Sequence, residues 1–423
     1  MNTIGSGLVS IVPDIAPGSP FAKHGTAAMI STDSAPLNQF RAAVSADPVL
    51  ERRLGAIAQM MEFIGVAVGE AATRGIALDP VTLERALSPD PLGLDRFLPR
   101  PITSETIPGP AWLPAAIVEA PTGLAIDWFY LGDAGLSDPF FEDSIRRGRS
   151  LPISRLIRHR TPLATLPEAV GAGGAVPDGL IFHLSRCGST LVAQMLAALP
   201  GAVVASEPAP FDQIVQRAQE ASDQPIEQRI ALIRAMAAAL GRRATPGAGF
   251  VIKTDCWHTK ALPLLAAAFP DTPWIFLYRD PIDIMVSQFR QRGFQTIPGG
   301  IGTTVFGISS DGLSQEEYCA LLLERTCAPI LEAADRSRGL LINYAQLPEA
   351  VEDTILPHFG MALDAGARAA FAAAATRDAK APYAAFTPDT EAKRREASPA
   401  IRAAVTRYLD APYQRLEMLR TGD

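Results

Sequence analysis

The sequence predicts an α/β protein in which a parallel sheet flanked by helices occupies residues 172–423, behind a mainly helical N-terminal module. Short apolar runs alternate with amphipathic segments over this region, which is the pattern of a parallel sheet with crossover helices. One run, WIFLY at 274–278, is apolar without interruption, as in a strand buried on both faces of a sheet. The chain has 423 residues, 48% of them hydrophobic, so it can bury a large core.

The N-terminal part begins with an arm and a helical module. Residues 1–35 are rich in Gly, Pro, Ser and Ala without a sustained apolar period, which predicts a flexible arm. Residues 36–90 carry apolar residues at helical spacing. We expect three helices there: a short first one, a long second one opened by Pro48 that continues through Val68, and a third capped by Asp79.

A Pro-rich segment, residues 91–171, follows the helical module. Its prolines exclude long helices and predict a linker and accessory segment. Within it, we expect a strand at 125–131 and a helix at 140–149, which ends in basic residues.

The region from 172 onward alternates strands and helices. A Gly-rich hinge precedes the first strand, and the remainder past residue 349 is mostly Ala-rich helix. The predicted strands are 179–184, 202–205, 250–253, 274–278 and 340–343.

Composition excludes several classes of protein. Acidic residues outnumber basic ones, 45 against 38, and the net charge of −7 argues against a nucleic-acid partner. The five histidines form no HxD, HxE or HExxH pattern, so no metal is expected. The four scattered cysteines predict a reducing, cytoplasmic location, and no apolar run is long enough to span a membrane.

The first chemical motif is IFHLSRCGSTLVAQML, a strand that turns through a small-residue loop into a helix. Such a turn directs backbone N–H groups and the positive end of the helix dipole at one place, where a phosphate or sulfate binds. Arg186 adds a charge, and Gly188 permits close approach of the backbone. The loop lacks the lysine of a Walker A motif. The alternative is an ordinary turn capped by a serine.

The second motif is FLYRDPIDIMVSQF, which begins at the end of the uninterrupted apolar strand. Arg279 is placed at the carboxyl end of this strand, and Asp280 caps the helix that follows. Ser287 lies two helical turns after Asp280, on the same face. We expect Arg279 and Ser287 to converge on one anion at the carboxyl edge of the sheet.

Together the two motifs resemble those of the sulfotransferase family, whose members use 3′-phosphoadenosine 5′-phosphosulfate (PAPS) as donor and release adenosine 3′,5′-bisphosphate (PAP). SRCGSTL is similar to the 5′-phosphosulfate loop, in the variant with Arg in place of Lys, and YRDPIDIMVS to the 3′-phosphate motif. The resemblance covers residues 177–360 and implies a P-loop NTPase-like α/β fold. The cofactor-binding residues it implies are Ser185, Arg186, Cys187, Gly188, Ser189, Thr190, Arg279 and Ser287.

Sulfuryl transfer is an in-line displacement that is catalysed mainly by positioning and charge. Arg186 and the loop amides would hold the sulfonate, and Lys253, at a strand end, would neutralise the leaving oxygen. A base must take the acceptor proton, and Glu207 and His258 are the two candidates. Asp255 stands where many relatives have Pro or His. His183, inside the first strand, is expected to pack in the core.

Other residues near these motifs have simpler interpretations. Cys187 is expected to be a small residue that fits a tight loop rather than a reactive thiol. The basic run at 393–395 is the nearest match to the family's nucleotide-covering loop, and a solvated helix surface is the interpretation we favour for it. Glycines between 293 and 315 suggest a mobile cover over the site.

The helical module at 36–90 resembles, in its apolar spacing, the Nif11-like module of peptide leaders. That resemblance implies a contact with a peptide or protein, and the alternative is a helical cap on the larger domain. The predicted activity is therefore transfer from PAPS to a hydroxyl or amine of a small-molecule or peptide acceptor, without a metal. The other candidates are a P-loop nucleotide-dependent kinase and a non-catalytic PAP-binding or scaffold protein.

Overall fold

The structure is a computed structural model that describes residues 34–88, 101–136, 138–171, 173–221, 223–245, 247–376 and 390–422, the last range without the side chains of 390–392. The predicted arm, residues 1–35, lies almost entirely outside these residues. Among the described helices, none combines the length and the apolar character that crossing a membrane requires.

The N-terminal module consists of helices, as predicted, but the long second helix is divided. Asp47 caps a helix that ends at Gly55, where a side chain would collide with the Tyr130 ring. A new helix starts five residues later, at Met60, and Met61, predicted to face inward, is 70% exposed. The expected single helix is therefore wrong, because close packing on Tyr130 ends it. The helices are α1 (Ala35–Ala46), α2 (Pro48–Gly55), α3 (Met60–Thr73) and α4 (Pro80–Leu87).

The segment predicted as a Pro-rich linker contains a four-stranded sheet in the order β1-β4-β3-β2. The predicted strand and helix at 125–131 and 140–149 are present as β3 and α5, but strand β2 was missed. Pro114 lies in β2 next to a register shift between Pro114 and Ala116, which is how an interior proline is tolerated. The elements are β1 (Ile102–Thr103), β2 (Trp112–Ala120), β3 (Gly123–Tyr130), α5 (Phe141–Ser150), α6 (Pro152–Leu156), β4 (His159–Pro162), η2 (Leu163–Thr165) and α7 (Leu166–Val170).

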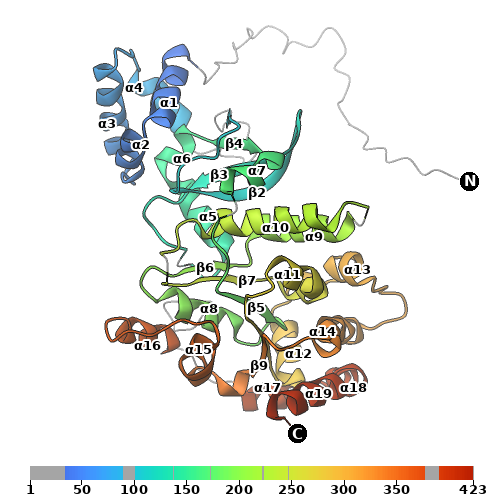
Figure 1. Ribbon diagram of the computed structural model, residues 1–423. Helices are drawn as coiled ribbons and strands as arrows, with labels where there is room; N and C mark the ends of the chain where they lie inside the picture. Colours follow the sequence, from blue (N-terminus) through green and yellow to red (C-terminus); the bar gives the residue numbers. More distant parts are fainter. Residues whose placement is uncertain are drawn as a thin grey trace, which may run out of the picture.

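A second sheet of five parallel strands, in the order β6-β7-β5-β8-β9, confirms the predicted fold class. Its strands are short (Figure 1). Almost all of their residues are buried, which agrees with their mostly apolar sequences. Because all five strands are parallel, their carboxyl ends lie at one edge. The strands are β5 (Gly179–His183), β6 (Val203–Ser206), β7 (Phe250–Lys253), β8 (Trp274–Tyr278) and β9 (Gly339–Asn343).

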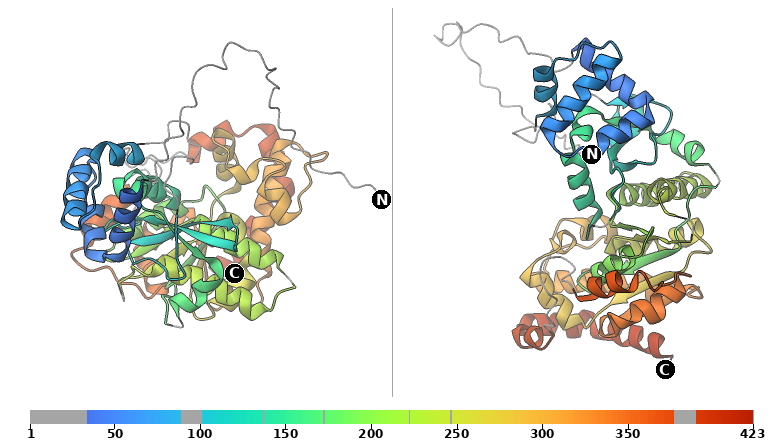
Figure 2. Two further views of the ribbon diagram at one scale, coloured as in Figure 1. Left: turned by 90° about the horizontal axis from the view of Figure 1, so that it is seen from above. Right: turned by 90° about the vertical axis from the view of Figure 1, so that its left-hand side faces the viewer.

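Helices cover both faces of this sheet, and the C-terminal helices lie at the end of the molecule opposite α1–α4 (Figure 2). They are α8 (Ser189–Ala197), α9 (Ala209–Glu220), α10 (Ile226–Gly241), η3 (Cys256–Ala261), α11 (Leu262–Ala268), α12 (Pro281–Arg290), η4 (Phe294–Thr296), α13 (Ile301–Phe306), α14 (Gln315–Glu332), η5 (Tyr344–Gln346), η6 (Val351–Ile355), α15 (Leu356–His358), α16 (Arg368–Thr376), α17 (Thr390–Glu396), α18 (Pro399–Tyr408) and α19 (Asp410–Thr421).

Helices α9 and α10 lie between the two sheets and join them (Figure 1). The Gln213 side chain on α9 accepts a hydrogen bond of 2.8 Å from the backbone N–H of Ile117 in β2. Arg242, after α10, donates to the carbonyls of Pro108 and Gly109 at 2.9 and 2.5 Å, and burial lowers its pKa to about 10. The accessory sheet is thus joined to the parallel sheet through hydrogen bonds made by α9 and by the residue that follows α10.

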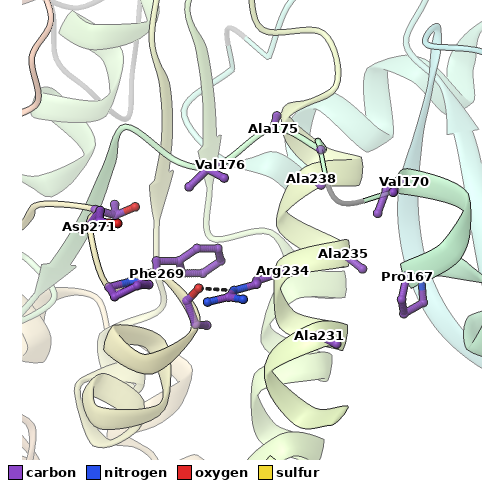
Figure 3. Close-up of a pocket in the computed structure, with 15 residues that line it drawn as sticks. Pro167, Val170, Ala175, Val176, Ala231, Arg234, Ala235, Ala238, Phe269 and Asp271 are labelled. Atoms are coloured by element: carbon purple, nitrogen blue, oxygen red, sulfur yellow. Dashed lines mark hydrogen bonds between the residues drawn. The ribbon is translucent and has the colours of Figure 1, made fainter. Parts of the chain in front are cut away.

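A groove of about 560 Å³ lies between α7, α10 and the turn after α11 (Figure 3). Its lining is mostly small and apolar, and Arg234 reaches across it to the Ala268 carbonyl at 2.5 Å. Val176 and Thr272 line it just before β5 and β8 begin. The groove therefore lies at the edge where the parallel strands start, away from the predicted site residues at their carboxyl ends.

Candidate functional site

The loop between β5 and α8 has the backbone of an anion-binding nest. Ser185, Arg186 and Gly188 all have positive φ, at 33°, 59° and 89°. Helix α8 then begins at Ser189 without a side-chain cap, so no side chain at the cap position takes up its first N–H groups. Consecutive N–H groups in such a turn, at the positive end of a helix, favour an anion.

Gly188 is required at this place for two reasons. Its φ of 89° disfavours any residue with a side chain, and a Cβ there would come within 2.8 Å of both Tyr344 and Leu347. Tyr344 and Leu347 belong to the turn after β9. The loops that follow β5 and β9 therefore meet at the carboxyl edge of the sheet, in direct contact.

Two side chains of the loop, Ser185 and Cys187, contact protein groups around it. The Ser185 hydroxyl oxygen accepts hydrogen bonds from Gln288 and Gln295, at 3.2 and 3.1 Å. The Cys187 thiol is buried, contacts the Leu277 carbonyl at 3.2 Å, and has a pKa raised to about 11 by burial. Cys187 thus points into the sheet, as a small structural residue would.

Arg186 is bound to the end of α12. Its Nη2 donates to the Gln291 carbonyl at 3.0 Å, to the Gln291 side-chain oxygen at 3.1 Å and to the Ser287 carbonyl at 3.3 Å. Burial lowers the pKa of this guanidinium. The predicted donor-binding Arg186 thus links the loop to α12, while Ser189 and Thr190 are buried at the start of α8.

The second motif is organised around Asp283, a residue that the sequence reasoning did not single out. Arg279 is 6% exposed and donates from Nε and Nη2 to one oxygen of Asp283, at 2.9 and 2.7 Å. Ser287 donates to the backbone carbonyl of Asp283 at 2.8 Å. Ser287 lies on α12 and Arg279 two residues before this helix begins. The two were expected to converge on one anion, but in the structure both bind Asp283. The spacing of four residues between Arg279 and Asp283 was the signal that could have revealed this pair.

Arg279 also stacks on an aromatic ring. Its guanidinium carbon lies 3.9 Å from the centroid of the Tyr344 ring, in the turn after β9. Asp280 caps α12 as predicted, accepting from the N–H of Ile282 at 2.9 Å. The Tyr344 ring is therefore shared between Arg279 and the backbone of Gly188, and it joins the two motifs.

Lys253 and Glu207 form an ion pair at the ends of the adjacent strands β7 and β6. The Lys253 ammonium is fully buried and lies 2.5 Å from Oε1 of Glu207 and 3.4 Å from Oγ of Ser206. The Phe140 ring, from the accessory region, lies 5.0 Å from the same ammonium. Burial alone would raise the pKa of the Glu207 carboxyl, but Lys253 and His183 outweigh it and hold that pKa below its usual range.

Glu207 also has a positive φ of 54°, an unfavourable conformation for a residue with a side chain. Its backbone N–H donates to the Lys253 carbonyl at 2.7 Å, which fixes the turn. Strained backbone of this kind persists where surrounding contacts determine it, and functional sites are common places for it.

His183 lies beside this pair, although the sequence predicted only a core residue. It is 3% exposed at the end of β5, and its Nδ1 accepts from the N–H of Ser185 at 3.0 Å. Its Nε2 lies 3.0 Å from the Thr254 carbonyl and 3.3 Å from Glu207. The predicted burial is confirmed, and as the last residue of its strand His183 also reaches the edge where the loops meet.

His258, the other candidate base, is enclosed. It is 1% exposed, its Nε2 lies 2.7 Å from Asp212, and its Nδ1 is buried without a partner among the described residues. Trp257 and Gln216 donate to the same Asp212 carboxylate at 2.8 and 2.7 Å. The arrangement leaves no ring nitrogen of His258 open to solvent.

Asp255 adds a second carboxyl to this group. It is 9% exposed, and burial, followed by the charges of Glu207 and Asp212, raises its pKa well above the usual range. Asp212, Asp255 and His258 each bring one ligand-type atom to within 4.8 Å of the others. The prediction that the reaction uses no metal is not tested by this arrangement.

The basic run at 393–395 lies on α17, which packs along α12. Lys393 is 6% exposed, and Arg394 lies 3.2 Å from Asp280, the cap of the second motif. The expectation of a solvated helix surface is therefore wrong for Lys393, because α17 turns this side chain toward the protein. The run is adjacent to the Arg279 motif in space although more than 100 residues separate them in sequence.

Comparison with known proteins finds one matching family and several solved structures of low sequence identity. Residues 180–355 match the model described as "Sulfotransferase family". The sulfotransferase domain of the curacin biosynthetic pathway is 13% identical, with a TM-score of 0.35 over 56% of this chain and 98% of that one. The sulfotransferase domain of the Synechococcus PCC 7002 olefin synthase is 16% identical, with a TM-score of 0.34 over 58% and 95%.

Sulfotransferase STF9 from Mycobacterium avium is 14% identical, with a TM-score of 0.36 over 58% of this chain and 79% of that one. No curated protein matches the chain. The matched segment 180–355 contains the loop at 185–190, Glu207, Lys253 and Arg279. The resemblance to the sulfotransferase family that the two motifs predicted is confirmed over residues 180–355.

Proposed function

We propose that this protein is a sulfotransferase that moves the sulfuryl group of PAPS to a hydroxyl or amine of an acceptor. The observation that carries the proposal is the family match over the segment whose loops meet at one sheet edge. Arg279, Lys253 and the start of α8 supply positive charge or N–H groups at that edge. A nucleotide with several negative charges is the ligand that such an edge favours.

The donor is held at two places in this proposal. The N–H groups at the start of α8, with the hydroxyls of Ser189 and Thr190, hold the 5′-phosphosulfate end, and Arg279 with Ser287 holds the 3′-phosphate. Arg186 takes part after it exchanges its contacts at Gln291 for the donor. Backbone N–H groups at a helix start and arginine forks are the usual donors to such oxygens.

Lys253 and Glu207 divide the chemistry between them. The acceptor oxygen or nitrogen attacks sulfur and loses its proton to Glu207, while the bridging S–O bond breaks and its electron pair stays on the PAP phosphate oxygen. Lys253 neutralises that oxygen. As Lys253 turns from Glu207 to the leaving oxygen, the carboxylate loses the cation that depresses its pKa and becomes a stronger base.

Glu207 is the better candidate base on accessibility. Its side chain is 26% exposed next to Lys253, whereas the His258 side chain is 1% exposed and bound to Asp212. No metal is needed in this scheme, because Lys253 and Arg279 supply the charge. The location proposed for the reaction is the cytoplasm, and all four cysteines are unpaired and buried.

The acceptor is a small molecule or a peptide in this proposal. Val49 and Met61 on the helical module are 72% and 70% exposed, which supports a peptide or protein contact there. Phe140 brings the accessory region next to Lys253, so that region forms part of the acceptor entrance. Neither contact uses a nucleic acid or a membrane span.

Transfer of radiolabel from PAPS to a panel of phenols, alcohols, amines and peptides tests the proposal. We expect labelled product from wild type, and a loss of about 100-fold or more in rate for Glu207→Gln and for Lys253→Ala. Lys260→Ala, a nearby exposed lysine, is the matched control and should leave the rate unchanged. Equal rates in Glu207→Gln, Lys253→Ala and wild type would overturn the assigned roles.

Two further assays on the same protein preparation distinguish the kinase and the non-catalytic binding protein from a sulfotransferase. Mg²⁺-dependent phosphate transfer from ATP, without binding of PAP, would identify a nucleotide-dependent kinase. PAP binding that is never followed by transfer to any member of the panel would favour a non-catalytic binding or scaffold protein. Either result would contradict the proposed sulfotransferase activity.

A further inference from the structure

We infer that His183 is a positioning residue whose imidazole holds the Glu207 carboxylate and ties it to the donor-binding loop. The inference rests on the proposed function, because Glu207 is the base only in that reaction. His183 is the last residue of β5, directly before the loop, and is 3% exposed. Its two ring nitrogens contact two different parts of the site.

The hydrogen bonds fix the ring's tautomer. Nδ1 accepts the backbone N–H of Ser185 at 3.0 Å, so Nδ1 carries no proton. In the neutral ring the proton is then on Nε2. This nitrogen faces two acceptors, the Thr254 carbonyl at 3.0 Å and Oε1 of Glu207 at 3.3 Å, and both suit an N–H donor.

The surroundings keep this ring neutral. Burial disfavours the imidazolium and lowers the pKa of His183, and the nearby Lys253 ammonium acts in the same direction. Glu207 opposes them, but the net direction is downward. The ring therefore offers a single N–H to the carboxylate without adding a second positive charge that would weaken it as a base.

The contact matters most when Lys253 leaves Glu207. In the structure the carboxylate is held by Lys253 at 2.5 Å and by His183 at 3.3 Å. When the ammonium moves to the leaving oxygen, His183 is, among the residues that the structure describes, the side chain that still contacts the carboxylate and orients it toward the acceptor proton. A misplaced base lowers the rate constant of the chemical step and leaves donor binding intact.

The other nitrogen carries the link to the donor loop. Because the Ser185 N–H is bound to Nδ1, it holds the first residue of the loop in its positive-φ conformation at 33°. The same ring thus sets both the loop and the base. We expect the two functions to be separable by amide side chains that imitate one nitrogen each.

His183→Asn keeps an oxygen near the position of Nδ1, which can accept from Ser185, and removes the donor to Glu207. His183→Gln keeps an N–H near the position of Nε2 and removes the acceptor for Ser185. We expect His183→Asn to retain the PAP-induced rise in melting temperature and the acceptor KM, and to have a kcat about 100-fold lower than wild type. The assays use phenol as the acceptor, with water as the alternative acceptor. His183→Gln should retain more of kcat and lose more of the PAP effect.

A wild-type kcat in His183→Asn would overturn the inference, as would equal losses of kcat and PAP binding in both variants. In the Glu207→Gln background, His183→Asn should have no further effect on kcat. If kcat fell again by the factor seen in the single variant, His183 would not act through Glu207. Imidazole nitrogen NMR with labelled histidines gives a readout independent of activity. The signals that are missing from His183→Asn belong to His183, and we expect them to show a neutral ring protonated at Nε2. A ring protonated at Nδ1, or an imidazolium, would overturn the inference.

Failure of the proposed function gives a different pattern. Wild type would then show neither a PAP effect nor transfer, while the NMR result would still establish the His183 hydrogen bonds. Failure of the inference alone leaves PAP binding and transfer intact in wild type and changes only the comparison of variants.

Discussion

Arg279 donates two hydrogen bonds to one oxygen of Asp283, while the other oxygen of that carboxylate is buried without a partner among the described residues. The pair is almost completely enclosed, with side-chain exposures of 7% and 2%. Removing one member of such a pair leaves an uncompensated buried charge, which is far more costly than removing both. The stability and the ligand binding of this motif are therefore linked.

The first prediction follows for Arg279→Ala. We expect it to lower the free energy of unfolding by about 3–5 kcal/mol, and Arg279→Ala/Asp283→Ala to recover much of that loss. Urea unfolding of the two variants measures the difference. Arg290→Ala, on the same helix and paired with Glu396 at the surface, is the control and should cost less than about 1 kcal/mol. Equal losses in the single and double variants would mean that Asp283 is not the partner that matters.

The second prediction concerns the close approach at Gly188. Gly188→Ala meets Tyr344 and Leu347 at 2.8 Å in addition to the strain of its φ, so it should destabilise the protein and abolish PAP binding. Gly312→Ala has a similar φ of 73° but open space around it, and should cost only about 1–2 kcal/mol. Thermal unfolding with and without PAP compares them. A Gly188→Ala protein that binds PAP like wild type would remove the loop from the site.

The third prediction concerns acid stability through Glu417 on α19. Burial would raise the pKa of its carboxyl, but Arg420, Tyr278 and Asn343 outweigh burial and lower it to about 2. Because the folded pKa is lowered, the stabilisation is present above the unfolded value of 4.5 and is lost as the pH falls toward 2.

Glu417→Gln should therefore be less stable than wild type near neutral pH by roughly 1–2 kcal/mol, because solvent screens part of the interaction, and the gap should shrink at about pH 3 and below. Urea unfolding at both pH values gives the comparison. Glu84→Gln, an exposed glutamate on α4, serves as the matched control. A gap that does not depend on pH would show that the hydrogen bonds, and not the charge, make this contribution.

The parallel strands were predictable because their signal is local. The runs at 250–253 and 274–278 form β7 and β8 with the predicted bounds, since three to five successive apolar residues suit a buried strand. The break between α2 and α3 was not predictable, because Gly55 ends the helix against Tyr130, which is 75 residues away in sequence. Strand β2 was hidden by Pro114, whose irregular register only the sheet reveals.

Part of the candidate site was likewise predictable from the sequence, and part of it was not. The loop at 185–190 and the strand-end positions of Lys253 and Arg279 follow from strand–loop–helix order, which the sequence displays. The pairs His183–Glu207 and Lys253–Glu207 depend on which strands are neighbours, and alternating strands and helices leave the strand order open. Asp283 could have been found, since it lies four residues after Arg279, in the first turn of the helix that follows β8.

Binding of PAP, read as a change in melting temperature, tests the proposed nucleotide site most directly. We expect millimolar PAP to raise the melting temperature of wild type without Mg²⁺, and to leave Arg279→Ala/Asp283→Ala unchanged while Arg290→Ala responds like wild type. A wild-type protein whose melting temperature does not respond to PAP would contradict the nucleotide site and the sulfotransferase reaction built on it.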